Sequence, residues 1–252
     1  MNIPFSVQTQ LGHRTIRKFK NQLLSKETIN LLLEVANRTA TSNGMQNFSI
    51  IIIDDQKIKD AISEIANQTH LKEVPFFALF IVDTYRNYHI ALQEGVELEA
   101  FKDMDRFIQG FTDASLAAQN MVNAAESLGL GVNYFGSILN DPRKLIEVVG
   151  LPKLTMPVVG LGLGYPDQEP MLKPRIPLKN KVFYNSYQKC NNYNEAFKEY
   201  DQALSEYYDL RDLTKPIGKF SEQIISKHQN INPVRVKYMQ VAKEQGYDLK
   251  LD

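Results

Sequence analysis

Apolar side chains recur along this chain in two spacings, and each spacing predicts one kind of secondary structure. Continuous apolar stretches of strand length, such as Ile50 to Ile53, indicate strands that are buried on both faces. Apolar residues three and four positions apart predict helices over residues 26–38 and 56–67, the first with Ser25 as its N-cap. The expected strands span residues 47–54, 76–83 and 157–164, and residues 132–138 are expected to form a strand and a loop. Helices alternating with buried strands favour an α+β sandwich, a sheet covered by helices.

The longest helical pattern lies in the middle of the chain and carries a single apolar seam. Its members are Phe107, Phe111, Ala114, Ala118, Met121, Ala125 and Leu128. The alanines allow another element to approach closely, so packing accounts for the whole seam. Gly129 and Gly131 end this helix, and Asp141 with Pro142 predicts the start of a short one.

After Pro177 the composition changes to many tyrosines and charges, with further helical patterns over residues 193–210, 222–228 and 234–245. We therefore expect a core of residues 1–178 and a helical extension of residues 179–252. The extension is expected to pack on the core or on a partner chain, within the same domain.

The overall charge excludes some classes of partner. The 252 residues contain 29 Lys plus Arg against 29 Asp plus Glu, so no global field attracts nucleic acid or an anionic membrane. The longest apolar run, residues 76–82, is too short to cross a bilayer, and no secretory signal is visible. We expect a cytoplasmic protein. Cys190 is the single cysteine, which leaves no disulfide or CxxC pair, and we interpret it as an incidental thiol.

Familiar nucleotide, metal and hydrolase motifs are missing. The glycines at 160, 162 and 164 end a late strand and are followed by Pro166, which argues against a Rossmann site and indicates a close neighbour instead. The sequence has no P-loop, HExxH or GxSxG motif, and its four histidines are scattered, so no metal site is expected.

Two basic clusters remain as candidates for chemistry. In the first, His13, Arg14, Thr15 and Arg17 are spaced to surround a phosphate with guanidinium forks and a hydroxyl. In the second, Pro174 fixes the backbone between Lys173 and Arg175, which makes a clamp for an anion. The alternative for each is a solvated basic turn, because charge runs are usually on the surface.

These stretches resemble the FMN-dependent nitroreductase family, in its NADPH-preferring, oxygen-insensitive nitroreductase and flavin reductase branch. That family opens with a His-Arg-Ser-x-Arg-x-Phe motif, matched here from His13 to Phe19 with Thr15 in place of serine, and carries Lys-Pro-Arg late in its flavin-binding core. The segments at 125–131 and 185–187 are also typical of it. The resemblance implies a mixed, mostly antiparallel central sheet flanked by helices, with a helical C-terminal extension.

The resemblance also implies roles for named residues. His13, Arg14 and Thr15, helped by Lys173 and Arg175, would hold the FMN phosphate and ribityl chain. Arg17 would reach the pyrimidine edge of the ring, where a cation stabilises the charge that reduction creates. Further contacts are implied for Thr41, Ser42, Gln68, Tyr134, Phe135, Gly136 and Ser137. The chain departs from the family at Ser137, where a second glycine is usual, and at Asn43 and Gly44 in the polar loop.

The segment around Arg211 corresponds to a basic loop that, in relatives of this branch, binds the 2′-phosphate of NADPH. Arg211 matches the first arginine of that loop, and Lys215 is a nearby substitute for the second. The alternative is that Arg211 pairs with Asp209 or Asp212 on the surface.

The resemblance implies a homodimeric FMN enzyme that takes hydride from NADPH and reduces nitroaromatics, quinones or free flavin by a ping-pong mechanism. No side chain needs to act as a catalytic nucleophile, because the chemistry belongs to the flavin. The alternative is a flavin-binding storage or sensor protein without turnover. A nucleic-acid-binding protein is disfavoured by the neutral net charge and the lack of a basic helix face.

Overall fold

The computed structural model describes residues 2–209 and 214–248. The chain divides into two compact units, Met1–Gln168 together with Asn232–Asp252, and Glu169–Ile231, and each is described here by itself. The expected division into residues 1–178 and 179–252 of one domain stays a prediction. Within the described ranges, no helix is long and apolar enough to cross a membrane.

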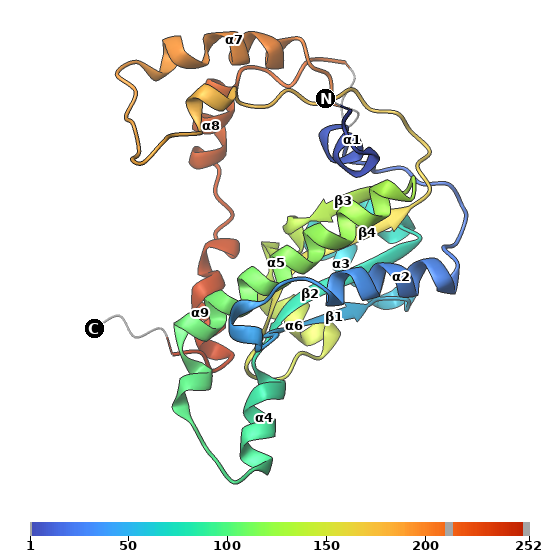
Figure 1. Ribbon diagram of the computed structural model, residues 1–252, viewed down its shortest axis with the longest axis vertical. Helices are drawn as coiled ribbons and strands as arrows, with labels where there is room; N and C mark the ends of the chain where they lie inside the picture. The colour runs from blue at the N-terminus through green and yellow to red at the C-terminus, as the bar shows by residue number, and fades with distance from the viewer. Residues whose placement is uncertain (1, 210–213, 249–252) are drawn as a thin grey trace. The chain divides into compact units, whose positions relative to one another are not determined.

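A four-stranded sheet forms the centre of the first unit, in the order β1-β2-β4-β3 (Figure 1). Its strands are β1 (Phe48–Ile52), β2 (Phe76–Asp83), β3 (Gly131–Phe135) and β4 (Thr155–Gly164). Neighbouring strands pair antiparallel, and Phe80 lies opposite Ile50 on one side and Val159 on the other. Parallel pairing occurs at isolated bridges such as Thr15 with Val132. The expectation of a mostly antiparallel sheet is therefore confirmed, and within the described residues parallel pairing is limited to isolated bridges outside the pairs that the four strands make.

Helices cover both faces of this sheet, which explains why its central strands are apolar except for Asp83 and Thr155 at their ends. Every residue of β2 is buried. Phe80 belongs to the cluster under one helical layer and Phe77 to the cluster under the other, as alternation along a strand requires. The first layer is α2 (Lys26–Asn37) and α5 (Met104–Ser127), and the second is α3 (Gln56–Ala66) and α6 (Pro142–Val149). Figure 1 shows α2 and α5 side by side across the sheet.

Side-chain caps fix the beginnings of these helices. The Ser25 hydroxyl accepts a hydrogen bond from the Thr28 N–H at 3.1 Å, and Asp141 accepts one from Lys144 with Pro142 at the first position. Both caps were predicted from the sequence and are confirmed. Asp55 caps α3 in the same way, accepting from the N–H groups of Lys57 and Ile58.

Other elements differ from the sequence expectation. The helix α4 (Tyr85–Gln93) was not predicted: none of its residues is buried, so it lacks the apolar periodicity that reveals a helix. In the second unit, α7 (Tyr193–Ser205) ends before the expected residue 210. Beyond its end, the Tyr207 carbonyl accepts a hydrogen bond from the Ile217 N–H and not from a further helical turn. The remaining α-helices are α1 (Phe5–Leu11), α8 (Phe220–Gln229) and α9 (Tyr238–Glu244).

We predict that Gly110→Ala destabilises the first unit. A Cβ at Gly110, on the buried face of α5, would lie 2.5 Å from the Asn47 carbonyl oxygen and 2.6 Å from a Val82 methyl group. The gain in helix propensity, about 1 kcal/mol, is smaller than the clash with rigid backbone. Urea unfolding should show a loss of about 1–3 kcal/mol.

Thr112→Ala, on the exposed side of the same helix, is the control and should change stability by less than about 0.5 kcal/mol. A Gly110→Ala protein as stable as the wild type would show that α5 shifts freely on the sheet.

Candidate functional site

The basic turn that the sequence singled out is pinned to the start of β3. The Ile16 N–H donates to the Val132 carbonyl at 2.8 Å, and the Ile16 side chain is buried. A Cβ on Gly131 would lie 2.7 Å from Ile16 Cγ1, so only glycine admits this approach. Further on, the Arg17 N–H donates to Gln168 Oε1 at 2.9 Å. The basic side chains around Ile16 are therefore carried by a fixed backbone, unlike those of a solvated tail.

His13 is held by a carboxylate at the end of α5. Its Nδ1 lies 2.6 Å from Glu126 Oε1, and the Glu126 side chain is only 11% exposed. Burial, and secondly the Glu126 charge, raise the pKa of the Tyr134 hydroxyl, so Tyr134 stays neutral. The hydroxyl donates to Gln119 Oε1 at 3.2 Å. Glu126 thus sets the orientation of the imidazole beside the basic turn.

Arg14 has a buried donor that nothing in the described residues satisfies. Its Nη1 donates to the Gly12 carbonyl at 2.9 Å, but its Nε has no hydrogen-bond partner. A buried, unsatisfied donor on a charged group costs about 1–3 kcal/mol or more, and an anion that accepts from it would remove that cost. The turn therefore fits a phosphate group.

A second group of predicted residues lies where β3 ends. The Gln68 Nε2 donates to Ser137 Oγ at 2.6 Å, which brings these two predicted contacts together. Phe135 is fully buried against Phe77, with ring centroids 5.7 Å apart, so its backbone and not its ring is available to a ligand. Tyr134 and Gly136 flank it on the same segment.

Arg235 joins this group and was missed by the sequence analysis. Its Nη1 donates to the Gly136 carbonyl at 2.9 Å, from a position 99 residues further along the chain. It lies in the 3-10 turn Arg235–Lys237, just before α9. No short motif surrounds it, so only the folded chain shows that this exposed cation stands beside Gly136.

The polar loop at Thr41 and Ser42 is fixed by Asp113, which the sequence analysis also missed. Asp113 is 1% exposed on α5 and accepts from the Ser42 N–H at 2.9 Å and the Asn47 N–H at 3.2 Å. Asp113 and Glu126 are 13 residues apart on α5, which separates them by about 20 Å along the axis. Within one chain, the loop and the basic turn are therefore held at different places on α5.

The second unit carries the other predicted cations. The Arg175 Nη1 donates to the Lys173 carbonyl at 3.0 Å, and Lys173 Nζ lies 6.0 Å from the centroid of the Tyr207 ring. Lys215 is exposed. Arg211 lies outside the described residues.

The fold and the site together define an α+β protein with a fixed basic turn suited to an anionic cofactor. Models of the "Nitroreductase family" and the "Nitroreductase family, C-terminal domain" match residues 11–165 and 173–250. An FMN reductase (NADPH) of Bacillus subtilis is 35% identical over 224 residues, 88% of this chain and 90% of that protein. An NADPH-dependent oxidoreductase of Staphylococcus aureus is 34% identical over 216 residues, 84% of this chain and 86% of that protein.

Solved structures agree. The structure of the NfrA1 nitroreductase from Bacillus subtilis superposes with a TM-score of 0.88 at 33% identity, covering 96% of this chain and 98% of that one. The chain belongs to the nitroreductase family. The sequence resemblance, the α+β class and the expectation of an oxidoreductase enzyme are confirmed.

We predict that Asp113→Asn loosens the polar loop. The amide keeps one acceptor oxygen but turns an N–H₂ donor toward one of the two backbone N–H groups that the carboxylate satisfies. The loss should be about 1–3 kcal/mol in urea unfolding, with faster hydrogen exchange at Ser42 and Asn47.

Asp105→Asn, an exposed change in the first turn of the same helix, is the control. Unchanged exchange at both amides in Asp113→Asn would show that the loop holds its shape without the carboxylate.

Proposed function

We propose that this enzyme binds FMN at the basic turn and uses NADPH to reduce small electron acceptors, namely nitroaromatics, quinones or free flavins. The observation that carries the proposal is the buried, unsatisfied Nε of Arg14 on a turn that Ile16 fixes to β3. The expected NADPH-dependent, flavin-based reduction is confirmed by relatives named FMN reductase (NADPH) and NADPH-dependent oxidoreductase.

The residues present fit FMN. His13, Arg14 and Thr15 would supply donors for the phosphate and ribityl chain, and the help expected from Lys173 and Arg175 stays a prediction. When bound, the flavin supplies the chemistry, accepting two electrons as hydride from NADPH and passing them on. Arg17 would hold positive charge at the pyrimidine edge, and Gln68 and the backbone from Tyr134 to Ser137 would border the ring.

We further propose that the site is completed by a second copy of the chain. Asp113 holds Thr41 and Ser42 about 20 Å along α5 from the Glu126 beside His13, which favours a partner as the source of the loop. Exposed apolar side chains on α2 and α5 supply a surface for that partner. They are Leu31, Ile108 and Leu116. The cytoplasmic location expected from the sequence stays a prediction.

An anaerobic mixing experiment tests the proposal. Purified protein, reconstituted with FMN and mixed with NADPH without oxygen, should lose the visible flavin absorbance, and a quinone added afterwards should restore it. A flavin storage or sensor protein would keep its visible absorbance after NADPH is added. That result would contradict the proposal that this site belongs to an enzyme.

We predict that Arg211→Ala selectively weakens the use of NADPH. If Arg211 grips the 2′-phosphate, the variant should raise KM for NADPH by about 5- to 30-fold, since exposed charge contacts are screened by solvent. KM for NADH, which lacks this phosphate, should hardly change, and kcat should move less than KM because the phosphate is remote from the hydride. Steady-state kinetics with both cofactors measure this.

Lys215→Ala should add a smaller effect of the same sign. Equal losses with NADPH and NADH would assign Arg211 a structural role, for example pairing with Asp209 or Asp212, and would contradict the predicted specificity.

A further inference from the structure

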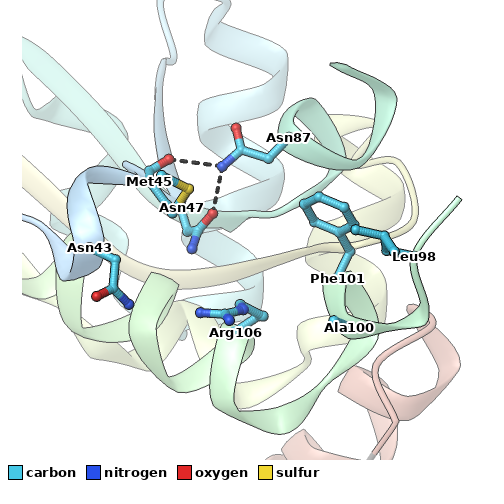
Figure 2. Close-up of a pocket in the computed structure, with 8 residues that line it drawn as sticks. All are labelled: Asn43, Met45, Asn47, Asn87, Leu98, Ala100, Phe101 and Arg106. Atoms are coloured by element: carbon cyan, nitrogen blue, oxygen red, sulfur yellow. Dashed lines mark hydrogen bonds between the residues drawn. The ribbon is translucent and has the colours of Figure 1, made fainter. Parts of the chain in front are cut away.

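A separate cleft of about 330 Å³ lies beside the polar loop, away from the basic turn. Four segments of the first unit form it: the stretch after Ser42, α4, the 3-10 turn Glu99–Lys102 with the residue before it, and the first turn of α5. Figure 2 shows the lining residues, which are Asn43, Met45, Asn47, Asn87, Leu98, Ala100, Phe101 and Arg106. Asn43 belongs to the polar loop and Asn47 is held by Asp113, but no ligand contact was assigned above to any lining residue.

Asn47 offers an unsatisfied donor in the wall of the cleft. The residue is 2% exposed, and its Oδ1 accepts from Asn87 Nδ2 at 2.8 Å, but its Nδ2 has no partner among the residues that the structure describes. In Figure 2 this nitrogen points away from Asn87, to the side where Asn43 and Arg106 lie. A buried amide N–H₂ without an acceptor is unfavourable, so a ligand oxygen there is favoured.

The orientation of this amide is determined by its neighbours. Asn87 Nδ2 also donates to the Met45 carbonyl at 2.8 Å, so its nitrogen position is fixed. Turning the Asn47 amide over would set two N–H₂ groups against each other. The Asn47 backbone is also fixed, because its N–H donates to Asp113 and its carbonyl accepts from Asp83. The donor therefore stays directed into the cleft.

Arg106 supplies the positive charge of the cleft. Its Nη1 donates to Gln109 Oε1 at 2.8 Å and lies 3.7 Å from Asp105 Oδ2, contacts that use only part of a group with five donors. It sits in the first turn of a 24-residue helix, where the helix dipole also favours an anion. The carboxylate of Asp105 offsets part of this field, so the preference for an anion is local to the guanidinium.

The remaining walls are apolar and include an aromatic ring. Phe101, Leu98 and Met45 face the same space, and the last two are about half exposed at its rim. An apolar wall with a few donors on one side is the usual form of a site for a small aromatic molecule. The volume suits a single ring, and the donors suit a group of acceptor oxygens at one end.

We propose that this cleft is a binding site for a one-ring aromatic carboxylate, with its oxygens toward Arg106 and Asn47 Nδ2 and its ring against Phe101 and Leu98. The site needs no flavin and no turnover, so it is independent of the function proposed above. It shares the loop that carries Thr41 and Ser42, which places the ligand next to a predicted contact of the cofactor.

Methyl-labelled methionine provides a test in which the binding position is seen directly. Full-length protein carrying ¹³C-methyl methionine is titrated with benzoate and, separately, with its neutral analogue benzamide. Met45→Leu identifies the Met45 resonance, and Met171 of the second unit, also exposed, is the internal control. Benzoate should shift the Met45 signal and leave the Met171 signal in place, and benzamide should bind about tenfold or more weakly.

Arg106→Leu should weaken benzoate binding by about 5- to 30-fold and leave benzamide binding unchanged, because only the carboxylate uses the charge. Lys57→Leu, an exposed loss of charge on α3, should change neither. Asn47→Asp keeps the acceptor for Asn87 and replaces the donor, so it should also weaken benzoate binding. Among the described residues, Arg106 contacts its helix neighbours Gln109 and Asp105, so Arg106→Leu decides the test even if Asn47→Asp does not fold.

A Met45 signal that does not move, or equal binding of benzoate and benzamide, would overturn the proposal. So would a benzoate effect that appears only in the flavin absorbance and is the same in Arg106→Leu, because that result places the ligand at the flavin. These outcomes can be interpreted even if the anaerobic NADPH test fails, because the titration measures ligand binding alone.

Discussion

The pairing of Ile16 with β3 is the contact on which the candidate site depends. One backbone hydrogen bond to Val132 and the burial of Ile16 against Gly131 hold a segment rich in positive charge against the sheet. Apolar burial thus supplies the free energy that keeps cationic side chains close together, which their mutual repulsion opposes. Arg14 can then keep a buried Nε without a partner until an anion is bound.

The helix α5 connects the parts of this arrangement. Its apolar seam from Phe107 to Ala125 packs on the sheet, while two carboxylates on the same helix, Asp113 and Glu126, orient the polar loop and the basic turn. The same helix begins beside the cleft that contains Arg106. A single rigid element therefore sets the positions of three polar regions, and a shift of α5 on the sheet would alter all of them.

The sequence predicted the fold better than the connections within the site. The strands and the caps at Ser25 and Asp141 follow from local patterns, and the structure confirms them. Asp113 and Arg235 were missed because their partners are 71 and 99 residues away, a separation that no motif records. The helix α4 was missed because it buries none of its residues.

The most direct test of the account compares FMN with riboflavin, which differs only by lacking the phosphate. Equilibrium binding to flavin-free protein should favour FMN by at least about 100-fold, since several charge-assisted hydrogen bonds go to the phosphate. In Arg14→Ala this ratio should fall about tenfold, whereas Arg143→Ala, which removes an exposed ion pair with Glu244, should leave it unchanged. Equal affinity of the wild-type protein for FMN and riboflavin would contradict the assignment of the basic turn as the phosphate site.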